Sequence, residues 1–425
     1  MNLRLLARPA VCGVLWLVPV LCTAADWPQW RGPERDGRSP EAGTLSDWTE
    51  HPPQLEWIVE GMGSGYASVS IVDGRLYTTG NFEDGQGVVA VDAHTGQTLW
   101  RQALTSGEPK HSYEGSRCTP TVDGDRLYIV TSDGRIACLR TDDGEVVWSR
   151  EFDEWGGRMM SHWGYSESPL VDGDRVICTP GGAGAMLVAL DKRTGREIWR
   201  ADVPDFGDRK AAAAYSSVVI SNAAGVKQYV TLVGQGAVGV RAEDGKFLWG
   251  YPRIANGTAN ISTPLIDGDQ VFVSTGYRTG GALLKLVADG AGVDAQEVYF
   301  LQPTVFQNHH GQMVLRDGYV YAGHGHKSGL PICVELQTGD VAWGGRTRGE
   351  GQGSAAINYV GERLIFRYED GVVALIEATP DDYTLHGTLM PEYQEGKSWS
   401  HPVVVDGKLY LREQDKLMCY ALSVE

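Results

Sequence analysis

One tryptophan recurs at an almost fixed spacing along this chain, always four residues after a glycine. Trp100, Trp148, Trp199 and Trp249 are separated by 48, 51 and 50 residues, and Trp343 follows after 94, which is two periods with one degenerate copy between. Periods of this size are typical of propellers, solenoids and other repeat arrays. The rest of each copy consists of short segments of alternating apolar and polar residues, so the period predicts a β-propeller.

Six copies begin with a strand and an Asp-Gly pair, which favours a type I′ hairpin because that turn needs positive φ at both central positions. The pairs are Asp73-Gly74, Asp123-Gly124, Asp172-Gly173, Asp267-Gly268, Asp317-Gly318 and Asp406-Gly407. A second hairpin leads to the tryptophan, so each copy supplies four strands. The copies start near Tyr66, Gly115, Trp163, Ala214, Asn260, His309, Gly353 and Trp399. We predict eight blades, with seven as the alternative if the degenerate copy around Val293 to Phe300 is misread.

The last copy lacks its outer, tryptophan-bearing strand, because the chain stops after Leu417 to Leu422. An orphan strand of that type lies near the other end, in Leu55 to Val59 around Trp57, 43 residues before Trp100. We expect it to pair with the last blade and close the ring, which removes exposed strand edges. The predicted fold is therefore all-β: a single eight-bladed propeller of four-stranded antiparallel blades over residues 53–425.

The first 25 residues read as a secretory signal peptide. Two arginines precede the apolar stretch Val11 to Leu21, and Thr23 to Ala25 offers a small-residue cleavage site. A lipoprotein signal ending at Cys22 is the competing interpretation. Eleven apolar residues are too few to span a bilayer, so we expect an exported protein of the periplasm or cell envelope that does not span the membrane, and a monomer.

Composition excludes some partners and cofactors. The net charge of −17 argues against nucleic acid, whose phosphates need a basic face. The five cysteines beyond the leader are odd in number and lie in strand-like runs, which favours buried free thiols. Without a C-x-x-C-H motif, no covalently attached haem is expected.

A Trp-rich segment over residues 26–52 precedes the first blade. It carries two tryptophans and two prolines before Gly37. We expect a strap packed on the ring with its indoles buried; a partner-docking peptide is the alternative, since Trp and Arg are enriched at binding hot spots.

Loop lengths indicate which face of the ring carries function. The loops leading into each blade, here called lead-in loops, are long, and together with the loops between second and third strands they must open on one face. Polar and aromatic residues gather there: His111, Tyr113, Glu114, Arg117, His162, Trp163, Tyr165, Glu167, Tyr215, Asn260, His309, His310, Trp399 and His401. Because first strands line a propeller's channel, we expect these residues to surround its mouth, and such a pocket is the default binding site.

A histidine cluster in the sixth copy raises the question of a metal. With Asp317-Gly318 as a two-residue turn, His309 would lie opposite His326 and Gly311 opposite His324, with His310 diagonal to His324. Opposed Cβ atoms are about 5 Å apart, so these four imidazoles could share a transition metal. The alternative is that they hydrogen-bond within the channel wall or face solvent.

The repeat, with its Val-Asp-Gly turn and Thr-Gly-x-x-x-Trp ending, resembles the pyrroloquinoline quinone (PQQ) propeller repeat. Close matches are Val91 to Gly96 and Leu190 to Gly195. Trp27 to Pro33, Ser161 to Pro169 and Asn308 to Gly311 are similar to segments of exported propellers common in planctomycete-type bacteria. That family has the propeller fold and usually no established activity.

The resemblance implies two classes of function. In quinoprotein alcohol dehydrogenases PQQ lies on a tryptophan above a calcium ion. By that resemblance Trp163 or Trp399 would form the floor, Arg117 would contact a quinone oxygen, and Glu167 and Asn260 would bind calcium. Calcium prefers six to eight oxygen ligands, yet no Asp stands at a blade entrance. The family's vicinal disulfide and long insertions are also absent.

The second class is a non-catalytic scaffold, similar to the propeller subunit of the bacterial outer-membrane β-barrel assembly machine, which holds protein partners on one face. A flat small molecule or a sugar stacked in the mouth is a third hypothesis. From the sequence we expect an exported scaffold that binds a protein partner or flat ligand. The alternative is a PQQ- and calcium-dependent oxidoreductase acting on alcohols, so whether the protein is an enzyme stays open at this stage.

Overall fold

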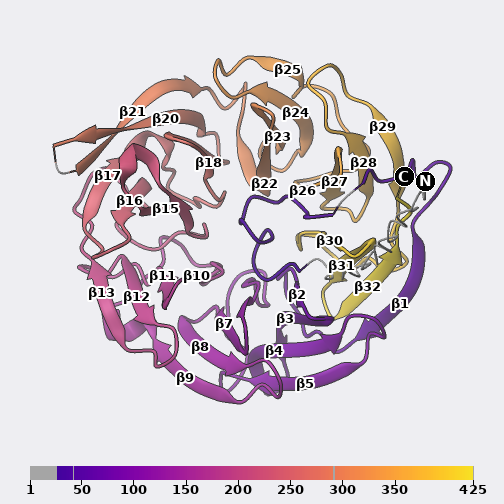
Figure 1. Cartoon of the computed structure of the whole chain (residues 1–425), viewed down its shortest axis with the longest axis horizontal. Helices are drawn as coiled ribbons and strands as arrows, with labels where there is room; N and C mark the ends of the chain where they lie inside the picture. The colour runs from indigo at the N-terminus through magenta and orange to yellow at the C-terminus, as the bar shows by residue number, and fades with distance from the viewer. Residues whose placement is uncertain (1–25, 42, 291, 425) are drawn as a thin grey trace, which may run out of the picture.

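The computed structural model describes residues 26–41, 43–290 and 292–424, and the predicted signal peptide lies outside them. Thirty-two strands form eight four-stranded antiparallel sheets, arranged as blades around a central axis (Figure 1). The predicted eight-bladed propeller is confirmed, and the seven-bladed alternative is wrong. Within the described ranges no helix has the length and apolar character that crossing a membrane requires.

The first four blades follow the chain from the innermost strand outward. Blade 1 consists of β2 (Ser70–Val72), β3 (Arg75–Phe82), β4 (Gly85–Asp92) and β5 (Thr98–Ala103). Blade 2 consists of β6 (Thr121–Asp123), β7 (Arg126–Val130), β8 (Arg135–Arg140) and β9 (Val146–Glu151). Blade 3 consists of β10 (Leu170–Asp172), β11 (Arg175–Cys178), β12 (Leu187–Asp191) and β13 (Glu197–Ala201). Blade 4 consists of β14 (Val219–Ser221), β15 (Gln228–Val233), β16 (Gly236–Arg241) and β17 (Phe247–Tyr251).

The other four blades continue the ring back to its start. Blade 5 consists of β18 (Leu265–Asp267), β19 (Gln270–Thr275), β20 (Gly280–Asp289) and β21 (Gly292–Leu301). Blade 6 consists of β22 (Asn308–Arg316), β23 (Tyr319–His324), β24 (Leu330–Glu335) and β25 (Val341–Gly344). Blade 7 consists of β26 (Ala355–Val360), β27 (Arg363–Tyr368), β28 (Val373–Glu377) and β29 (Leu385–Leu389). Blade 8 consists of β30 (Val403–Val405), β31 (Lys408–Glu413), β32 (Lys416–Ala421) and β1 (Gln54–Glu60).

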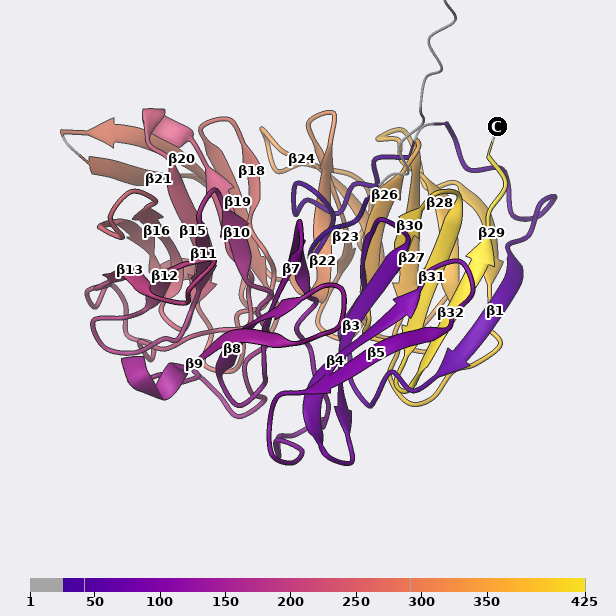
Figure 2. The same cartoon turned by 60° about the horizontal axis from the view of Figure 1, so that its bottom comes forward.

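Three short 3-10 helices and one long hairpin interrupt the regular pattern. The helices are η1 (Phe152–Trp155), η2 (Ala223–Gly225) and η3 (Pro252–Ile254). The β20–β21 hairpin has ten-residue strands and extends beyond the rim of the ring (Figure 2). The five cysteines are buried and free, as the sequence predicted.

The ring closes through the N-terminal strand. β1 pairs antiparallel with β32, with Gln54 opposite Ala421 and Trp57 opposite Cys419. Gly96 of blade 1 then packs against the Trp57 indole, where a Cβ would lie 3.1 Å from the ring. The predicted closure of the last blade by an N-terminal strand is confirmed.

The recurrence of the glycine and the tryptophan is explained by how blades meet, because the glycine of one copy contacts the tryptophan of the copy before it. The Trp100 indole Nε1 of blade 1 donates to the Thr141 carbonyl of blade 2 at 3.0 Å. Gly144 of blade 2 packs under the same indole, where a Cβ would be 2.5 Å from Trp100 Cε3, and its φ is +75°. A side chain is therefore excluded twice, by space and by backbone conformation. We call this contact the blade seam.

The degenerate copy keeps the seam with a different aromatic residue. Tyr299 in β21 of blade 5 donates its hydroxyl to the Leu336 carbonyl of blade 6 at 2.7 Å. A Cβ on Gly339 would lie 3.0 Å from the Tyr299 ring. The phenol of Tyr299 thus takes the place of the indole. Blade 5 therefore forms although the tryptophan of the repeat is missing from it.

The Asp-Gly turns are of two kinds. Asp73 and Gly74 both have positive φ, at 50° and 70°, as a type I′ turn requires. In blade 2, however, Asp123 pairs with Arg126, so the turn residues are Gly124 and Asp125. Asp172 pairs with Arg175 in blade 3 and Asp267 with Gln270 in blade 5 in the same way. The type I′ prediction is wrong in these three blades, because the extra Asp after Asp-Gly moves the turn one position along the chain.

A central cavity as the candidate functional site

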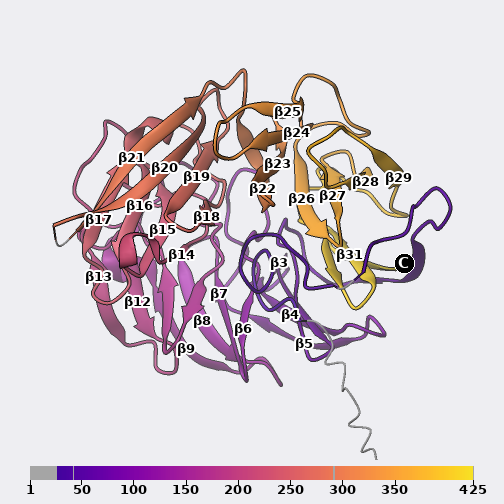
Figure 3. The same ribbon diagram turned by 45° about the horizontal axis from the view of Figure 1, so that its top comes forward.

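The N-terminal strap (residues 26–52) crosses the central channel, as the indigo segment in the middle of the ring shows (Figure 3). It contacts first strands, or the residues just before them, in seven of the eight blades. Its partners are Ile71, Val122, Ser168, Pro169, Thr263, Met313, Tyr359 and Val404. Trp27 is buried, whereas Trp30 is half-buried and faces the channel. The channel is therefore blocked by its own chain.

Two buried arginines anchor the strap. Arg35 donates to the Ser168 carbonyl at 2.7 Å and to the Pro169 carbonyl at 3.1 Å. Arg31 donates to the Asp36 carbonyl at 2.7 Å and to the carbonyl of Met313. Burial lowers the pKa of each guanidinium to about 10, so both remain cationic at neutral pH.

Beyond the strap lies a cavity of about 290 Å³. Its wall comes from lead-in loops, from the start of β22, and from the loops between second and third strands, as the loop lengths indicated. Trp30 of the strap also lines it. The lining residues are Trp30, Tyr66, Tyr113, Arg117, Trp163, Ser166, Tyr215, Ser217, Thr258, Ala259, Ile261, Thr263, Tyr277, His309, His310, Gln312, Lys327, Glu369, Lys397, Trp399 and His401.

Of the five residues that the resemblance assigned to a cofactor, Arg117, Trp163 and Trp399 line this cavity, whereas Glu167 and Asn260 do not. The reason is local. Ser166 faces the cavity, and so do Ala259 and Ile261, which flank Asn260. Successive side chains of an extended segment point to opposite sides, so Glu167 and Asn260 turn into the wall.

Both turned-in residues are bound within the protein. Asn260 Oδ1 accepts the Asn256 N–H at 3.0 Å, and its Nδ2 donates to the Val233 carbonyl at 2.8 Å. One Glu167 oxygen accepts the Thr179 N–H at 2.6 Å, and the other has no partner. Burial raises the pKa of Glu167 to about 7 despite the nearby Arg35.

Arg117 and Trp399 are also engaged by their surroundings. The Arg117 guanidinium donates to the carbonyls of Ser112, Tyr113 and Gly115 and so holds the loop that carries Tyr113. The Trp399 ring lies 4.9 Å from Tyr66 and from Tyr113, at 43° and 64°. Trp399 is thus one member of an aromatic cluster rather than a free flat floor.

The strand register predicted for the histidine cluster is wrong. Met313 pairs with Ala322 as expected, but the register then shifts, and His324 pairs with Asn308 instead of Gly311. The shift falls where Gly311 meets the Ala355 carbonyl so closely that any Cβ would overlap it. The extra residues form a bulge that lets β22 pass blade 7.

Of the four histidines that were proposed as metal ligands, three remain in contact and His324 is set apart. His309 and His310 line the cavity, and His326 lies 4.4 Å from the His309 ring. His324 does not line the cavity; its Nδ1 accepts the Gln307 N–H at 3.1 Å. In the part of the chain that the structure describes, no three His, Cys, Asp or Glu side chains are grouped to hold a metal ion. The transition-metal site stays a hypothesis.

The cavity histidines are neutral. Burial lowers the pKa of His401 to about 3 and that of His310 to about 4, and it lowers that of His309 further. His401 Nε2 donates to the His310 carbonyl at 3.2 Å, which leaves its Nδ1 as an acceptor without a partner. His309 Nδ1 is 2.8 Å from the Ser354 hydroxyl.

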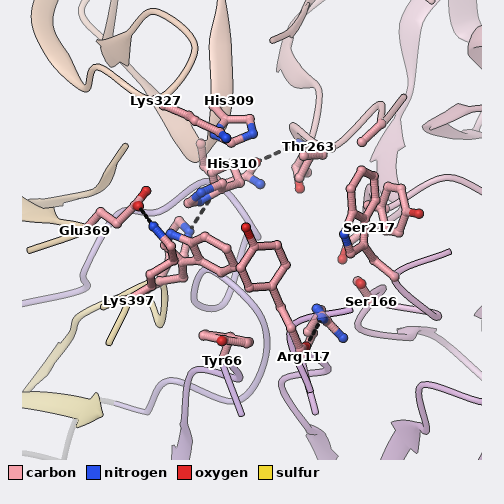
Figure 4. A pocket seen from close by; sticks show the side chains of 18 of the residues that line it. Tyr66, Arg117, Ser166, Ser217, Thr263, His309, His310, Lys327, Glu369 and Lys397 are labelled. Carbon is pink, nitrogen blue, oxygen red and sulfur yellow. Dashed lines mark hydrogen bonds and ion pairs between the residues drawn. The ribbon is translucent and has the colours of Figure 1, made fainter. Parts of the chain in front are cut away.

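Sequence reasoning missed several lining residues. Tyr277, Lys327 and Glu369 come from loops between second and third strands, whose face the sequence assigned without naming residues. Lys397 forms an ion pair with Glu369, and both lie beside His310, with Lys327 next to His309 (Figure 4). Position within these loops was the one signal that would have found them.

Comparison with known proteins agrees with this architecture. Residues 57–345 match the family model described as outer membrane protein assembly factor BamB, which is more than half of the chain. The chain belongs to this family of PQQ-type propellers. Its sequence relatives fall into two groups, assembly factors and quinoproteins, as the repeat indicated.

The sequence relatives are distant. BamB of Pseudomonas aeruginosa is 28% identical over 203 residues, 46% of this chain and 46% of the relative. Quinoprotein ethanol dehydrogenase of Pseudomonas putida is 30% identical over 148 residues, 32% of this chain. The matched part spans only 22% of that dehydrogenase, so the sequence similarity covers less than half of either relative.

Solved structures show the same fold. BamB from Moraxella catarrhalis superposes with a TM-score of 0.60 at 13% identity, covering 87% of this chain and 97% of that one. A quinohemoprotein alcohol dehydrogenase from Comamonas testosteroni gives 0.63 at 13% identity, covering 93% of this chain and 80% of that one. At this identity the likeness concerns architecture, and function must be argued from the site.

Proposed function

We propose that this protein is an exported, non-catalytic binding propeller of the cell envelope that takes a ligand in its central cavity. The observation that carries the proposal is the cavity itself. It is aromatic, closed on one side by the strap, and contains buried imidazole nitrogens without partners. Natural ligand sites combine an apolar wall with a few convergent polar groups in this way, and buried polar atoms without partners call for an occupant that satisfies them.

The wall carries no recognisable set of catalytic groups among the described residues. Glu369 is the one carboxylate that lines the cavity, and it is neutralised by Lys397. Most enzymes that hydrolyse a glycosidic bond use two carboxyl groups, one on either side of the bond. The Ser354 hydroxyl bound to His309 is buried and does not line the cavity. Binding without chemistry accounts for this arrangement.

The residues do not fit the PQQ and calcium pair of the alternative hypothesis. Calcium requires six to eight oxygen ligands, whereas the oxygens expected from Glu167 and Asn260 lie in the wall. The NH1 and NH2 groups of Arg117 already donate hydrogen bonds to backbone carbonyls, so they do not face a quinone oxygen. These residues therefore give no support to an oxidation of alcohols by this chain.

Export and a protein partner belong to the same proposal. The leader predicted over residues 1–25 supports export, and the relatives described as outer membrane assembly factors support a place in the cell envelope. The same similarity supports a protein-binding role for one face of the ring, beside ligand binding in the cavity.

The test is ligand binding by the purified protein and by a variant with a filled cavity. Ile261 lines the cavity without a hydrogen bond from its side chain, so Ile261→Trp should occupy the site without disturbing the blades. Val298→Trp is the matched control, because Val298 is 49% exposed on the outer strand β21. The panel contains neutral and acidic oligosaccharides, aromatic acids, and PQQ with and without calcium.

Thermal shift and tryptophan fluorescence report binding, since Trp30, Trp163 and Trp399 line the cavity. We expect one class of the panel to raise Tm and quench fluorescence in the native protein and in Val298→Trp, but not in Ile261→Trp. Stoichiometric PQQ uptake with alcohol-dependent dye reduction would overturn the proposal. So would a panel in which no compound distinguishes the native protein from Ile261→Trp.

A further inference from the structure

The polar atoms of the cavity call for hydroxyl groups. His401 is 6% exposed, and its unpartnered Nδ1 is an acceptor without charge. The buried His310 Nε2 also has no partner, and burial keeps this imidazole neutral at physiological pH. A hydroxyl donates one hydrogen bond and accepts two, so it satisfies an imidazole nitrogen in either tautomer. Several hydroxyls at different depths would satisfy this wall.

The aromatic surfaces of the cavity are tilted against each other. Trp399 meets the His310 ring at 63°, Trp163 meets Tyr215 at 62°, and Tyr277 meets His309 at 75°. In the described lining no contacting pair of rings is parallel. The negative face of an aromatic ring attracts the weakly positive C–H groups of a neighbour. A puckered sugar ring presents such groups in several directions, whereas a flat conjugated ring needs one flat floor.

Cationic groups without ion pairs lie on one side of the mouth. Lys327 lines the cavity and Arg278 lies nearby; both are exposed, and neither forms an ion pair among the described residues. Both cations help burial to lower the pKa of His326, whose Nδ1 has no partner. Arg117 and Lys397, by contrast, are already bound to carbonyls and to Glu369. In a chain with a net charge of −17, this local excess of positive charge favours an anionic ligand group.

We propose that the ligand of the central cavity is an acidic saccharide. Its sugar ring contacts Trp399 and Trp163 and hydrogen-bonds to His310 and His401. Its carboxylate or sulfate group lies at the rim, beside Lys327 and Arg278. The inference rests on the proposed function, because it names the ligand class for the same cavity.

The experiment compares acidic with neutral sugars by titration calorimetry. The probes are trigalacturonic acid, a sulfated galactosamine disaccharide, neutral galactotriose, and PQQ as a planar acid that is not a sugar. We expect an acidic sugar to bind at least about tenfold more tightly than galactotriose at low salt. The difference should shrink in 0.5 M salt, where the Debye length falls to roughly 4 Å. The first two probes tell a carboxylate from a sulfate.

The double variant Lys327→Met, Arg278→Met tests the rim. It should weaken binding of the acidic sugar about tenfold and leave the affinity for galactotriose unchanged. Lys110→Met is the control for loss of a cation away from the rim, since Lys110 lies on another lead-in loop within 4 Å of Glu108 and Glu114. Equal binding of acidic and neutral sugars, or tighter binding of PQQ than of any sugar, would overturn the inference. So would a double variant that behaves like Lys110→Met.

The two proposals fail differently. If a neutral sugar or an aromatic acid binds and Ile261→Trp abolishes that binding, the cavity is a ligand site and only the acidic saccharide is wrong. If no probe discriminates Ile261→Trp from the native protein, the cavity itself is not the site and both proposals fall.

Discussion

The blade seams and the cavity wall are built from the same aromatic residue types, yet they differ in how their polar atoms are satisfied. At a seam, Trp148 donates its indole N–H to the Lys192 carbonyl of the next blade at 3.0 Å. In the wall, His310 and His401 each keep a buried nitrogen without a partner. Trp100, Trp199 and Trp343 donate to the next blade in the same way, whereas the Trp249 N–H bonds within its own blade and the Trp57 indole nitrogen has no partner. The polar residues of the wall follow no such repeat. The residues that repeat along the sequence therefore build the ring, whereas the residues that do not repeat line the cavity.

The largest effect is expected at a seam. Trp148→Ala should destabilise the protein by about 3–5 kcal/mol, because a large aromatic contact and its hydrogen bond are lost between two blades. Urea unfolding measures the change. Val147→Ala, at a neighbouring residue that is 40% exposed, should stay within about 0.5 kcal/mol. Equal midpoints for the two variants would break the distinction between seam and surface.

A smaller effect is expected where the strap meets the wall. Arg35→Ala should destabilise the fold by roughly 2–3 kcal/mol, since it leaves the Ser168 and Pro169 carbonyls without their charged donor. Limited proteolysis should then cut the strap sooner than in the native protein. Arg38→Ala is the control within the same segment, because the Arg38 side chain is 41% exposed. If both variants resist protease equally, the strap is not held by this anchor.

The smallest effect on stability is expected inside the cavity wall, where the substitution should stabilise the protein instead of destabilising it. The pKa of Glu167 is raised from 4.5 to about 7 by burial, so the folded protein keeps a proton that the unfolded chain releases. Stability from this group is therefore present below about pH 4.5 and lost as pH rises through 7. Glu167→Gln cannot ionise and should be more stable than the native protein above pH 7, by about 1–3 kcal/mol.

Melting temperatures from pH 5 to pH 9 measure this difference between the two proteins. The gap should widen from pH 5 to about pH 7 and then level off, because above the folded-state pKa both states are ionised. A difference in Tm that is constant with pH would show that the Glu167 carboxyl does not titrate in this range. The buried position of Glu167 in the wall would then not affect its ionisation.

Much of the fold could be predicted because its signals are local and repeated. The period of the glycine and tryptophan pairs gave the number of blades, and the orphan strand around Trp57 gave the closure. The face that carries the cavity followed from loop lengths. Arg117, Trp163 and Trp399 were assigned to the mouth because they lie in lead-in loops.

The rest of the site depended on contacts between distant segments. Glu167 and Asn260 were assigned to the cavity by loop position, but the direction of a side chain alternates along an extended segment, and its phase is set by packing. The histidine register failed because β22 bulges where Gly311 meets blade 7. Lys327 and Glu369 reach the cavity from loops that carry no motif.

The sequence by itself determined a closed ring of eight blades, because most copies carry their own hairpins and a seam aromatic residue, and the orphan strand around Trp57 completes the last blade. Tertiary structure alone decided that the channel is blocked and that a cavity remains above the block. The reason is that the strap is not part of the repeat, so its position is fixed only by contacts with the first strands of seven blades. Which nitrogens in the wall stay unpaired follows from that assembly, since a hydrogen bond is made or left unmade only after distant segments meet.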